Sequence, residues 1–526
     1  MSFPILTTAV AVPLVGAVVT AAAPRLGVAS AAAIKQLGLL FSGIALVLGV
    51  VMAAQYETDG GLQFTETHTW IEALGVHYAL GVDGLSLLMV LLTVVLVPIV
   101  LLASWHDADH IAEREGDSLG TTATFVAWAL ALEGLSLAVF AASDVFLFYV
   151  VFEATLIPAY FLIGSFGHGD RGFAALKFLM YQLGGGLVLL AGVIGLYVVS
   201  AQNGTPSYLV SDLANLPIDR EAGRWLFVAF FIAFAVKAPL FPVHTWLADT
   251  TQRATPGTSV LLVCVLDKIG TYGMLRFCLG LFPEASQWAT PVVVTLALIS
   301  IVYGALLAIG QDDVLRLIGL TSLSHFGFIT LGIFAFSSQG QSGAILYMVN
   351  HGIGTAALFI VAGYLIRRRG TTLISEMGGF EKATPVLAGV LLVAGLATLS
   401  LPGLSPFISE LLVIIAAFDQ HWWVGAVAVS GIVLAAIYVL WAYQRIMTGP
   451  PREDAGEVRD LGVREIAAVV PLVALLIGLG FYPRPLFEAS NPYVSDLMQH
   501  VGVTDDAPSV DPAIYEAGHD QAEENN

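Results

Sequence analysis

Apolar residues occur along this chain in long runs, separated by short connections that hold most of the charged residues. A run of about 20 apolar residues can cross the ~30 Å hydrocarbon core of a membrane as a helix. Fourteen such runs lie at residues 3–22, 31–54, 84–104, 122–141, 143–165, 174–200, 225–246, 256–281, 288–309, 314–336, 341–366, 384–418, 424–447 and 463–482. The pattern predicts an all-α polytopic membrane protein with about 14 transmembrane helices.

Prolines interrupt the seventh run beside a charged residue, because Lys237 is followed by Pro239 and Pro242. Proline cannot donate a helical hydrogen bond, so we expect a broken helix with bare carbonyls beside the lysine. A lysine at mid-membrane depth costs about 2.5–3.5 kcal/mol on insertion scales. A buried ionisable group at a broken helix is typical of an ion path in a transporter. The alternative is a proline kink whose lysine reaches toward an interface.

The twelfth run has a similar interruption. Pro402, Pro406 and Glu410 follow one another at intervals of four residues, which places them on one helix face. Interrupted helices at corresponding positions indicate repeats of inverted topology. Because the two broken runs are five helices apart, we expect two inverted five-helix repeats, helices 4–8 and 9–13, with helices 7 and 12 broken.

This pattern divides the chain into five parts. Residues 1–121 contain helices 1–3 and an outer loop. The first repeat is residues 122–281 and the second is residues 288–447. Residues 448–502 contain helix 14 and an end segment, and residues 503–526 form an acidic tail. The tail has seven acidic residues and no lysine or arginine, a composition typical of disorder. The outer loop, residues 55–83, is acidic and aromatic, and we expect it to form a short hairpin or cap.

Basic residues are distributed unequally between the two sides of this arrangement. With the N-terminus outside, the inner connections hold fourteen lysines and arginines, and the outer ones hold only Arg220, Arg224 and Arg484. Inner loops of membrane proteins carry the excess of basic residues. We therefore expect a multi-pass protein of the cell (cytoplasmic or inner) membrane with both termini outside.

Composition narrows the possible functions. The chain is 57% hydrophobic and 12% charged, whereas soluble domains have about 25% charged residues. Its net charge of −19 provides no basic face for nucleic acid. Two cysteines, Cys264 and Cys278, cannot supply a four-cysteine iron–sulfur or zinc site. We expect neither a redox centre nor a cofactor in this chain.

Ionisable residues inside the predicted helices are the candidate site residues, because such groups usually face the bundle interior and mark proton or ion relays. Contact between Glu153 and Lys237 would keep both charged, and separation would favour their neutral forms, so the pair could act as a proton switch. Histidine suits proton shuttling near neutral pH, although hydrogen-bonded packing is an alternative role for His325 and His351. The candidates are Glu133, Glu153, Lys177, Lys237, Asp267, Lys268, His325, His351 and Glu410, with His244 as a point where protons enter.

Metal and nucleotide sites are not indicated. No pair of histidine or acidic residues has helical i, i+3 or i+4 spacing within a predicted spanning helix, as a helical metal site requires. Gly184, Gly185 and Gly186 lie inside a predicted helix, where we expect them to permit close packing or a local π-bulge.

Four stretches resemble the antiporter-like membrane subunits of respiratory complex I, the proton-translocating NADH–quinone oxidoreductase. They are LALEGLSLAVFAASDVFLFYVVFEATLIPAYFLIGSFG, FAVKAPLFPVHTWLADTTQRATPGTSVLLVCVLDKIGTYGMLRF, IGLTSLSHFGFITLGIF and LPGLSPFISELL. The resemblance covers about helices 3–14. It implies a non-redox subunit that moves protons, coupled to quinone reduction elsewhere in the complex. It also implies other membrane subunits, particularly neighbouring antiporter-like ones, and lipid as partners. NAD(H), FMN, iron–sulfur clusters and quinone are then expected in other subunits.

The resemblance also implies roles for individual residues. The family's coupling pair matches Glu153 and Lys237. Its central axis matches Lys268, His325 and His351, and its exit group matches Glu410. Possible additional members are Glu133, Lys177, His244 and Asp267. This chain departs from the family in two places. It has HTWLADTTQRATPGT where the family has HxWLPDAHxxAPT, and Asp267 precedes Lys268 where an apolar residue is expected. That aspartate could lower or raise the readiness of Lys268 to release its proton.

A subunit of a multi-subunit cation/proton antiporter is the alternative function, because those subunits share this fold. They commonly have lysine where this chain has Glu410, so the glutamate favours the complex I assignment. A purely structural scaffold would leave the mid-membrane charges unexplained.

Overall fold

The computed structural model describes residues 3–27, 30–58, 61–204, 206–450 and 458–505. The tail expected to be disordered lies outside the described residues from position 506 onward. The first elements are α1 (Ile5–Ala22), α2 (Ala31–Gln55), β1 (Gln63–Ile71), the 3-10 turn η1 (Glu72–Leu74), β2 (Val76–Val82), α3 (Gly84–Ala103), α4 (Asp109–Glu115), α5 (Ser118–Ala141), α6 (Val145–Ala154), α7 (Leu156–Phe166), α8 (Arg171–Gln202), α9 (Val210–Leu213), α10 (Arg220–Lys237) and α11 (Thr245–Arg253).

The remaining elements begin in the eighth predicted run. They are α12 (Pro256–Val260), the π turn η2 (Leu261–Leu266), α13 (Lys268–Gly273), the π turn η3 (Met274–Leu279), α14 (Pro283–Ile309), α15 (Val314–Ile333), α16 (Ser338–Arg369), the 3-10 turn η4 (Ile374–Glu376), α17 (Phe380–Ala383), α18 (Pro385–Thr398), α19 (Ser405–Gln420), α20 (Trp422–Met447), α21 (Val463–Phe481) and α22 (Arg484–Val501).

Twelve helical segments of the described residues are long and apolar enough to cross a membrane, so the prediction of a helical multi-pass protein is confirmed. The other two of the fourteen predicted runs are the seventh and the twelfth, in which the prolines near Lys237 and Glu410 predicted a break. Each divides into two shorter helices, α10 with α11 and α18 with α19. The passage of these two broken pairs across the membrane stays a prediction.

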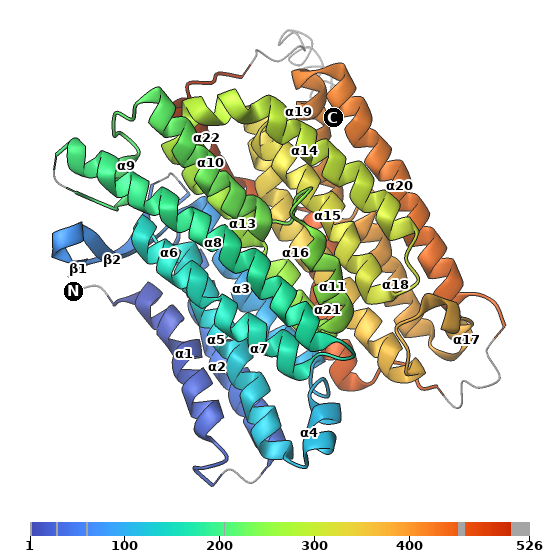
Figure 1. Ribbon diagram of the computed structural model, residues 1–526. Helices are drawn as coiled ribbons and strands as arrows, with labels where there is room; N and C mark the ends of the chain where they lie inside the picture. The colour runs from blue at the N-terminus through green and yellow to red at the C-terminus, as the bar shows by residue number, and fades with distance from the viewer. Residues whose placement is uncertain (1–2, 28–29, 59–60, 205, 451–457, 506–526) are drawn as a thin grey trace, which may run out of the picture.

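The loop between α2 and α3 forms a hairpin, as the sequence predicts, and it supplies the two β-strands of the described residues. Strands β1 and β2 pair antiparallel, with Gln63 opposite Val82 and Ile71 opposite Val76. The hairpin and α9 lie toward one end of the helical bundle, whereas α4 and α17 lie toward the other (Figure 1).

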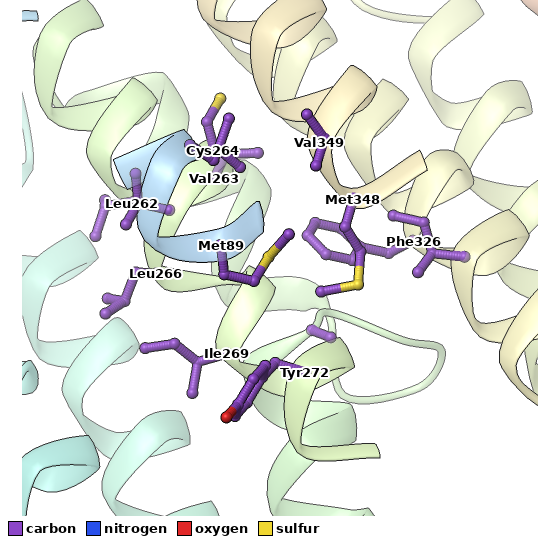
Figure 2. Packing of buried hydrophobic residues seen from close by; sticks show 14 of the residues in the cluster. Met89, Leu262, Val263, Cys264, Leu266, Ile269, Tyr272, Phe326, Met348 and Val349 are labelled. Carbon is purple, nitrogen blue, oxygen red and sulfur yellow. The ribbon is translucent and has the colours of Figure 1, made fainter. Parts of the chain in front are cut away.

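The segment from α12 to η3 lies in the middle of the molecule and is buried along its length, as is the apolar part of α16. Figure 2 shows Met89 of α3 among the apolar side chains of this segment, with Met348 of α16 nearby. Two π turns interrupt the segment on either side of α13. Each π turn adds a residue to a helical turn and redirects the side chains that follow it. Lys268 begins α13, and its side chain is buried in a largely apolar core.

Candidate functional site

The prolines end α10 beside a buried lysine, as the sequence predicts. Lys237 is the last residue of α10 and is 0% exposed. The prolines remove the helical donors to the carbonyls of residues 235 and 238. The carbonyl of Ala235 is not bare, because it accepts from the backbone N–H of Leu240 (3.0 Å), and the carbonyl of Val236 accepts from the indole Nε1 of Trp246 (3.1 Å). A local turn and a side chain of α11 therefore satisfy part of the backbone at this break, as membrane depth requires.

Lys237 is held by a hydroxyl and an aromatic ring. Its Nζ lies 3.4 Å from Oγ1 of Thr155 and 4.7 Å from the ring centroid of Phe152. Among the described residues Lys237 forms no ion pair, so the structure has Glu153 and Lys237 in the separated one of the two arrangements considered from the sequence. The two groups still interact electrostatically, although they are not in direct contact.

Glu153 packs against a glycine of α8. A Cβ atom at Gly186 would lie 1.7 Å from Oε1 of Glu153, whereas one at Gly184 would meet no atom within 4 Å. The expectation of close packing at these glycines therefore holds at Gly186, where it makes room for the carboxylate. The alternative of a π-bulge is wrong, because α8 is α-helical throughout.

Lys268 contacts the first of two buried histidines. Its Nζ lies 2.7 Å from Nδ1 of His351 and donates to the carbonyl of Val263 (3.3 Å). It also lies 4.3 Å from the ring centroid of Phe326, so its charge faces an aromatic surface as well. The sequence places Lys268 and His351 on different helices, and the fold brings them into direct contact.

From His351 the polar contacts continue to Glu410. The rings of His351 and His325 have centroids 5.1 Å apart, and Nδ1 of His325 lies 2.7 Å from the hydroxyl of Tyr347. That hydroxyl donates to Oε2 of Glu410 (2.6 Å), which leaves the tyrosine oxygen free to accept from the histidine. We call the set Lys268, His351, His325, Tyr347 and Glu410 the polar axis. Every member is buried.

The second proline break positions the last member of this axis. The chain leaves α18 after Thr398 and restarts as α19 at Ser405, with Pro406 in its first turn. Within the break, the hydroxyl of Ser400 donates to Glu410. Asn350 of α16 donates from Nδ2 to the carbonyl of Ser405 (2.9 Å). Both predicted breaks therefore place a buried ionisable residue next to backbone that is held by another helix.

Three of the possible additional residues lie apart from the polar axis. Lys177 pairs with Asp249 of α11 (2.6 Å), which also pairs with Arg316 (2.5 Å). Although burial opposes the effect, hydrogen bonds from these two cations hold the pKa of Asp249 below its usual value. His244 is buried before α11 and packs against aromatic rings. Glu133 is buried in α5, and neither of its carboxylate oxygens has a hydrogen-bond partner among the described residues.

The fourth possible additional residue, Asp267, is buried directly before Lys268. Its carboxylate interacts electrostatically with Lys237 and Lys268, yet it forms no hydrogen bond with a described residue.

Sequence reasoning missed Thr155 and Tyr347. Tyr347 precedes His351 by four residues on α16, a spacing that places both on one helix face and could have indicated it. Thr155 follows Glu153 by two residues at the junction of α6 and α7, and no spacing in the sequence connects it with Lys237. Among the described residues, no group of three or more His, Cys, Asp or Glu side chains could hold a metal ion.

Known proteins share this architecture. Residues 142–435 match the family described as NADH:quinone oxidoreductase/Mrp antiporter, TM. The chain is 48% identical over 502 residues to NADH-quinone oxidoreductase subunit M of Mycobacterium tuberculosis (strain ATCC 25618 / H37Rv), covering 90% of each chain. A chain of respiratory complex I from Thermus thermophilus with bound NADH superposes with a TM-score of 0.84 at 31% identity, over 95% of this chain and 100% of that one. A chain of the Mrp complex from Dietzia sp. DQ12-45-1b gives 0.83 at 23% identity, over 95% and 100%, which shows a shared fold.

Proposed function

The chain belongs to the subunit M family of NADH–quinone oxidoreductases, and we propose that it carries protons across the membrane through the polar axis while other subunits carry electrons. One observation carries this proposal. Buried ionisable and hydroxyl groups follow one another from Lys268 to Glu410, with hydrogen-bond distances of 2.7, 2.7 and 2.6 Å and one contact between histidine rings. Such groups inside a membrane bundle usually form proton relays.

Lys237 and Glu153 are the coupling pair in this proposal. Because they interact without contact, a small movement of either side chain would change the preference of both for their charged forms. Thr155 gives Lys237 an acceptor in both protonation states, because its hydroxyl donates to the carbonyl of Phe152 (2.6 Å) and both the ammonium and the neutral amine of Lys237 keep N–H groups that can donate to it. Glu410, at the second break, is the group from which protons leave the axis.

The two breaks support the proposal of two inverted five-helix repeats, residues 122–281 and 288–447. Each repeat has one broken pair, α10 with α11 and α18 with α19, and each break adjoins a buried ionisable residue. Substrate paths of transporters are commonly formed where such repeats meet.

The partners follow from the same family assignment. We propose that this chain assembles with the other membrane subunits of complex I, including neighbouring antiporter-like subunits. NAD(H), FMN, iron–sulfur clusters and quinone would be bound by other subunits. A cation/proton antiporter subunit is the weaker alternative, because the Mrp structure shares the fold at 23% identity, whereas the oxidoreductase relative reaches 48%.

Orientation is part of the proposal, with both termini outside the cell membrane. A reporter fused after Arg368, in the basic end of α16, should be cytoplasmic, and one fused after Pro483 should be outside. Alkaline phosphatase and green fluorescent protein fusions measure this directly. A cytoplasmic position after Pro483 would contradict the fourteen-helix arrangement.

The Tyr347 hydroxyl tests the continuity of the polar axis. Tyr347→Phe keeps the ring and removes the group that joins His325 to Glu410, so quinone-coupled proton uptake should fall by about tenfold or more. Tyr364→Phe is a matched control on the same helix, because the Tyr364 hydroxyl has no hydrogen-bond partner among the described residues. Proton uptake by inverted vesicles, normalised to assembled complex, provides the measurement. Equal uptake in the two variants would count against a proton path through Tyr347.

A further inference from the structure

One gap separates the coupling pair from the polar axis. Lys237 contacts Thr155 and Phe152, whereas Lys268 contacts His351. Among the described residues, no hydrogen bond or ion pair connects these contacts of Lys237 with that of Lys268. Asp267 is the charged group that interacts with both lysines.

Two features of the backbone place Asp267 in this gap. The π turn η2 closes with a hydrogen bond from the N–H of Asp267 to the carbonyl of Leu262 (2.9 Å), so this residue emerges from a redirected helical turn. Gly270 then packs α13 directly onto the broken end of α10. A Cβ atom there would lie 2.4 Å from the backbone N of Ala238 and 2.6 Å from the carbonyl of Phe234. The close approach brings the helical turn of Asp267 beside the end of α10.

The side chain of Asp267 is buried, and its carboxylate makes no structural hydrogen bond among the described residues. It is 1% exposed, and neither carboxylate oxygen has a hydrogen-bond partner among the described residues. Buried carboxylates with a structural role are normally hydrogen-bonded, because an unpaired one costs stability. The titratable groups that act on it are Lys237 from α10 and, on its own segment, Lys268 and Cys264. Its oxygens are therefore free to accept a proton from either lysine.

We propose that Asp267 is the group that passes protons between Lys237 and Lys268, an inference that rests on the proposed function. In the first step the Lys237 ammonium gives a proton to the Asp267 carboxylate, forming a neutral amine and a carboxylic acid. In the second step this acid protonates the neutral amine of Lys268, which restores the carboxylate and forms an ammonium. One proton moves and no further reactant is needed. Because Asp267 forms no ion pair with either lysine here, each transfer requires a side-chain movement or a bridging water.

The complex I resemblance predicts an apolar residue immediately before Lys268, so this group would be a feature of this chain and not of the general family path. In the polar axis, the proton received by Lys268 continues to His351 at 2.7 Å. Asp267 would thus complete the path on the side of α10, at a position where the resemblance predicts an apolar residue.

Three variants of the assembled complex test this role. Asp267→Asn keeps the shape and cannot accept a proton as a carboxylate does, and Asp267→Glu keeps the chemistry. Asp419→Asn, at an exposed position of α19, is the matched control. The proton-to-electron ratio is measured in proteoliposomes across pH, together with Lys237→Met. We expect Asp267→Asn to lower the ratio as Lys237→Met does, Asp267→Glu to restore at least half of the loss, and the control to match wild type.

The outcomes separate this inference from the proposed function. If Asp267→Asn reaches the wild-type ratio at any pH while Lys237→Met does not, Asp267 is no proton carrier, and the proposed function stands. If both variants reach the wild-type ratio, the proposed function itself is wrong. Infrared difference spectra provide a second readout. During turnover the wild-type spectrum should contain a carboxylic acid C=O band that Asp267→Asn lacks, whereas the bands of Glu153 and Glu410 should be common to both, and identical C=O regions in the two spectra would overturn the inference.

Discussion

Lys237→Met should leave the complex assembled and stop most proton transfer through this chain. Methionine has a similar length and no charge, so the buried site of Lys237 stays filled, and the cost of a buried lysine, about 2.5–3.5 kcal/mol on insertion scales, is removed. Quinone-coupled proton uptake should fall by about tenfold or more, since a positioned proton-transfer group contributes roughly 10²–10⁴-fold. NADH oxidation with a soluble acceptor should persist, because electrons are carried by other subunits in the proposed function.

Companion variants separate charge from packing in this prediction. Lys237→Arg should rescue little, because a guanidinium stays protonated. Glu153→Gln should resemble Lys237→Met, since it removes the charge that acts on the lysine. Gly186→Ala should displace the Glu153 carboxylate and lower uptake, whereas Gly184→Ala has free space and should not. Lys382→Met, at an exposed position in α17, is the lysine control. Wild-type proton uptake in an assembled Lys237→Met complex would favour the alternative that this break is a proline kink in which Lys237 carries no proton.

Glu410→Gln should produce a loss of similar size at the other end of the polar axis. Glutamine keeps the volume and a carbonyl oxygen that can accept from Tyr347 and Ser400, but it cannot take up and release a proton. Proton uptake should therefore fall by about tenfold or more. Glu410→Asp should retain part of the activity, because aspartate keeps the carboxylate on a shorter side chain. The measurement is uptake in inverted vesicles alongside subunit content.

The control for this variant is Glu488→Gln. Glu488 is half exposed, and its ion pair among the described residues is with exposed Arg484, an interaction of small energetic value. A Glu410→Gln complex that pumps at the rate of the control would show that protons do not leave through Glu410.

Much of the helical arrangement could be predicted from the sequence, because its signals are local. Runs of apolar residues mark the spans, and the prolines near Lys237 and Glu410 mark the two breaks. Partners in different helices were harder to predict. The sequence paired Glu153 with Lys237, but the junction between α6 and α7 brings Thr155 to the lysine instead. The carbonyl of Val236, beside Lys237, accepts from Trp246, which follows the lysine by nine residues.

The sequence predicted close packing at Gly186, but it did not show that the room is taken by a carboxylate. The role of Gly270, which brings α13 onto α10, and the positions of the π turns could not be predicted from spacing. The π turns that flank α13 lie in an apolar run with no proline to mark them. Tyr347 carried a usable signal, its spacing of four residues from His351, but a single tyrosine in an apolar helix usually indicates packing.

The proton-to-electron ratio of the assembled Lys237→Met complex tests the central claim most directly. Proton uptake by inverted vesicles is measured at an NADH oxidation rate matched to wild type, with subunit content determined in the same membranes. If protons cross through this chain, the variant should take up fewer protons per electron than wild type, and Lys382→Met should not. A wild-type ratio in the assembled Lys237→Met complex would contradict the claim that Lys237 takes part in proton transfer.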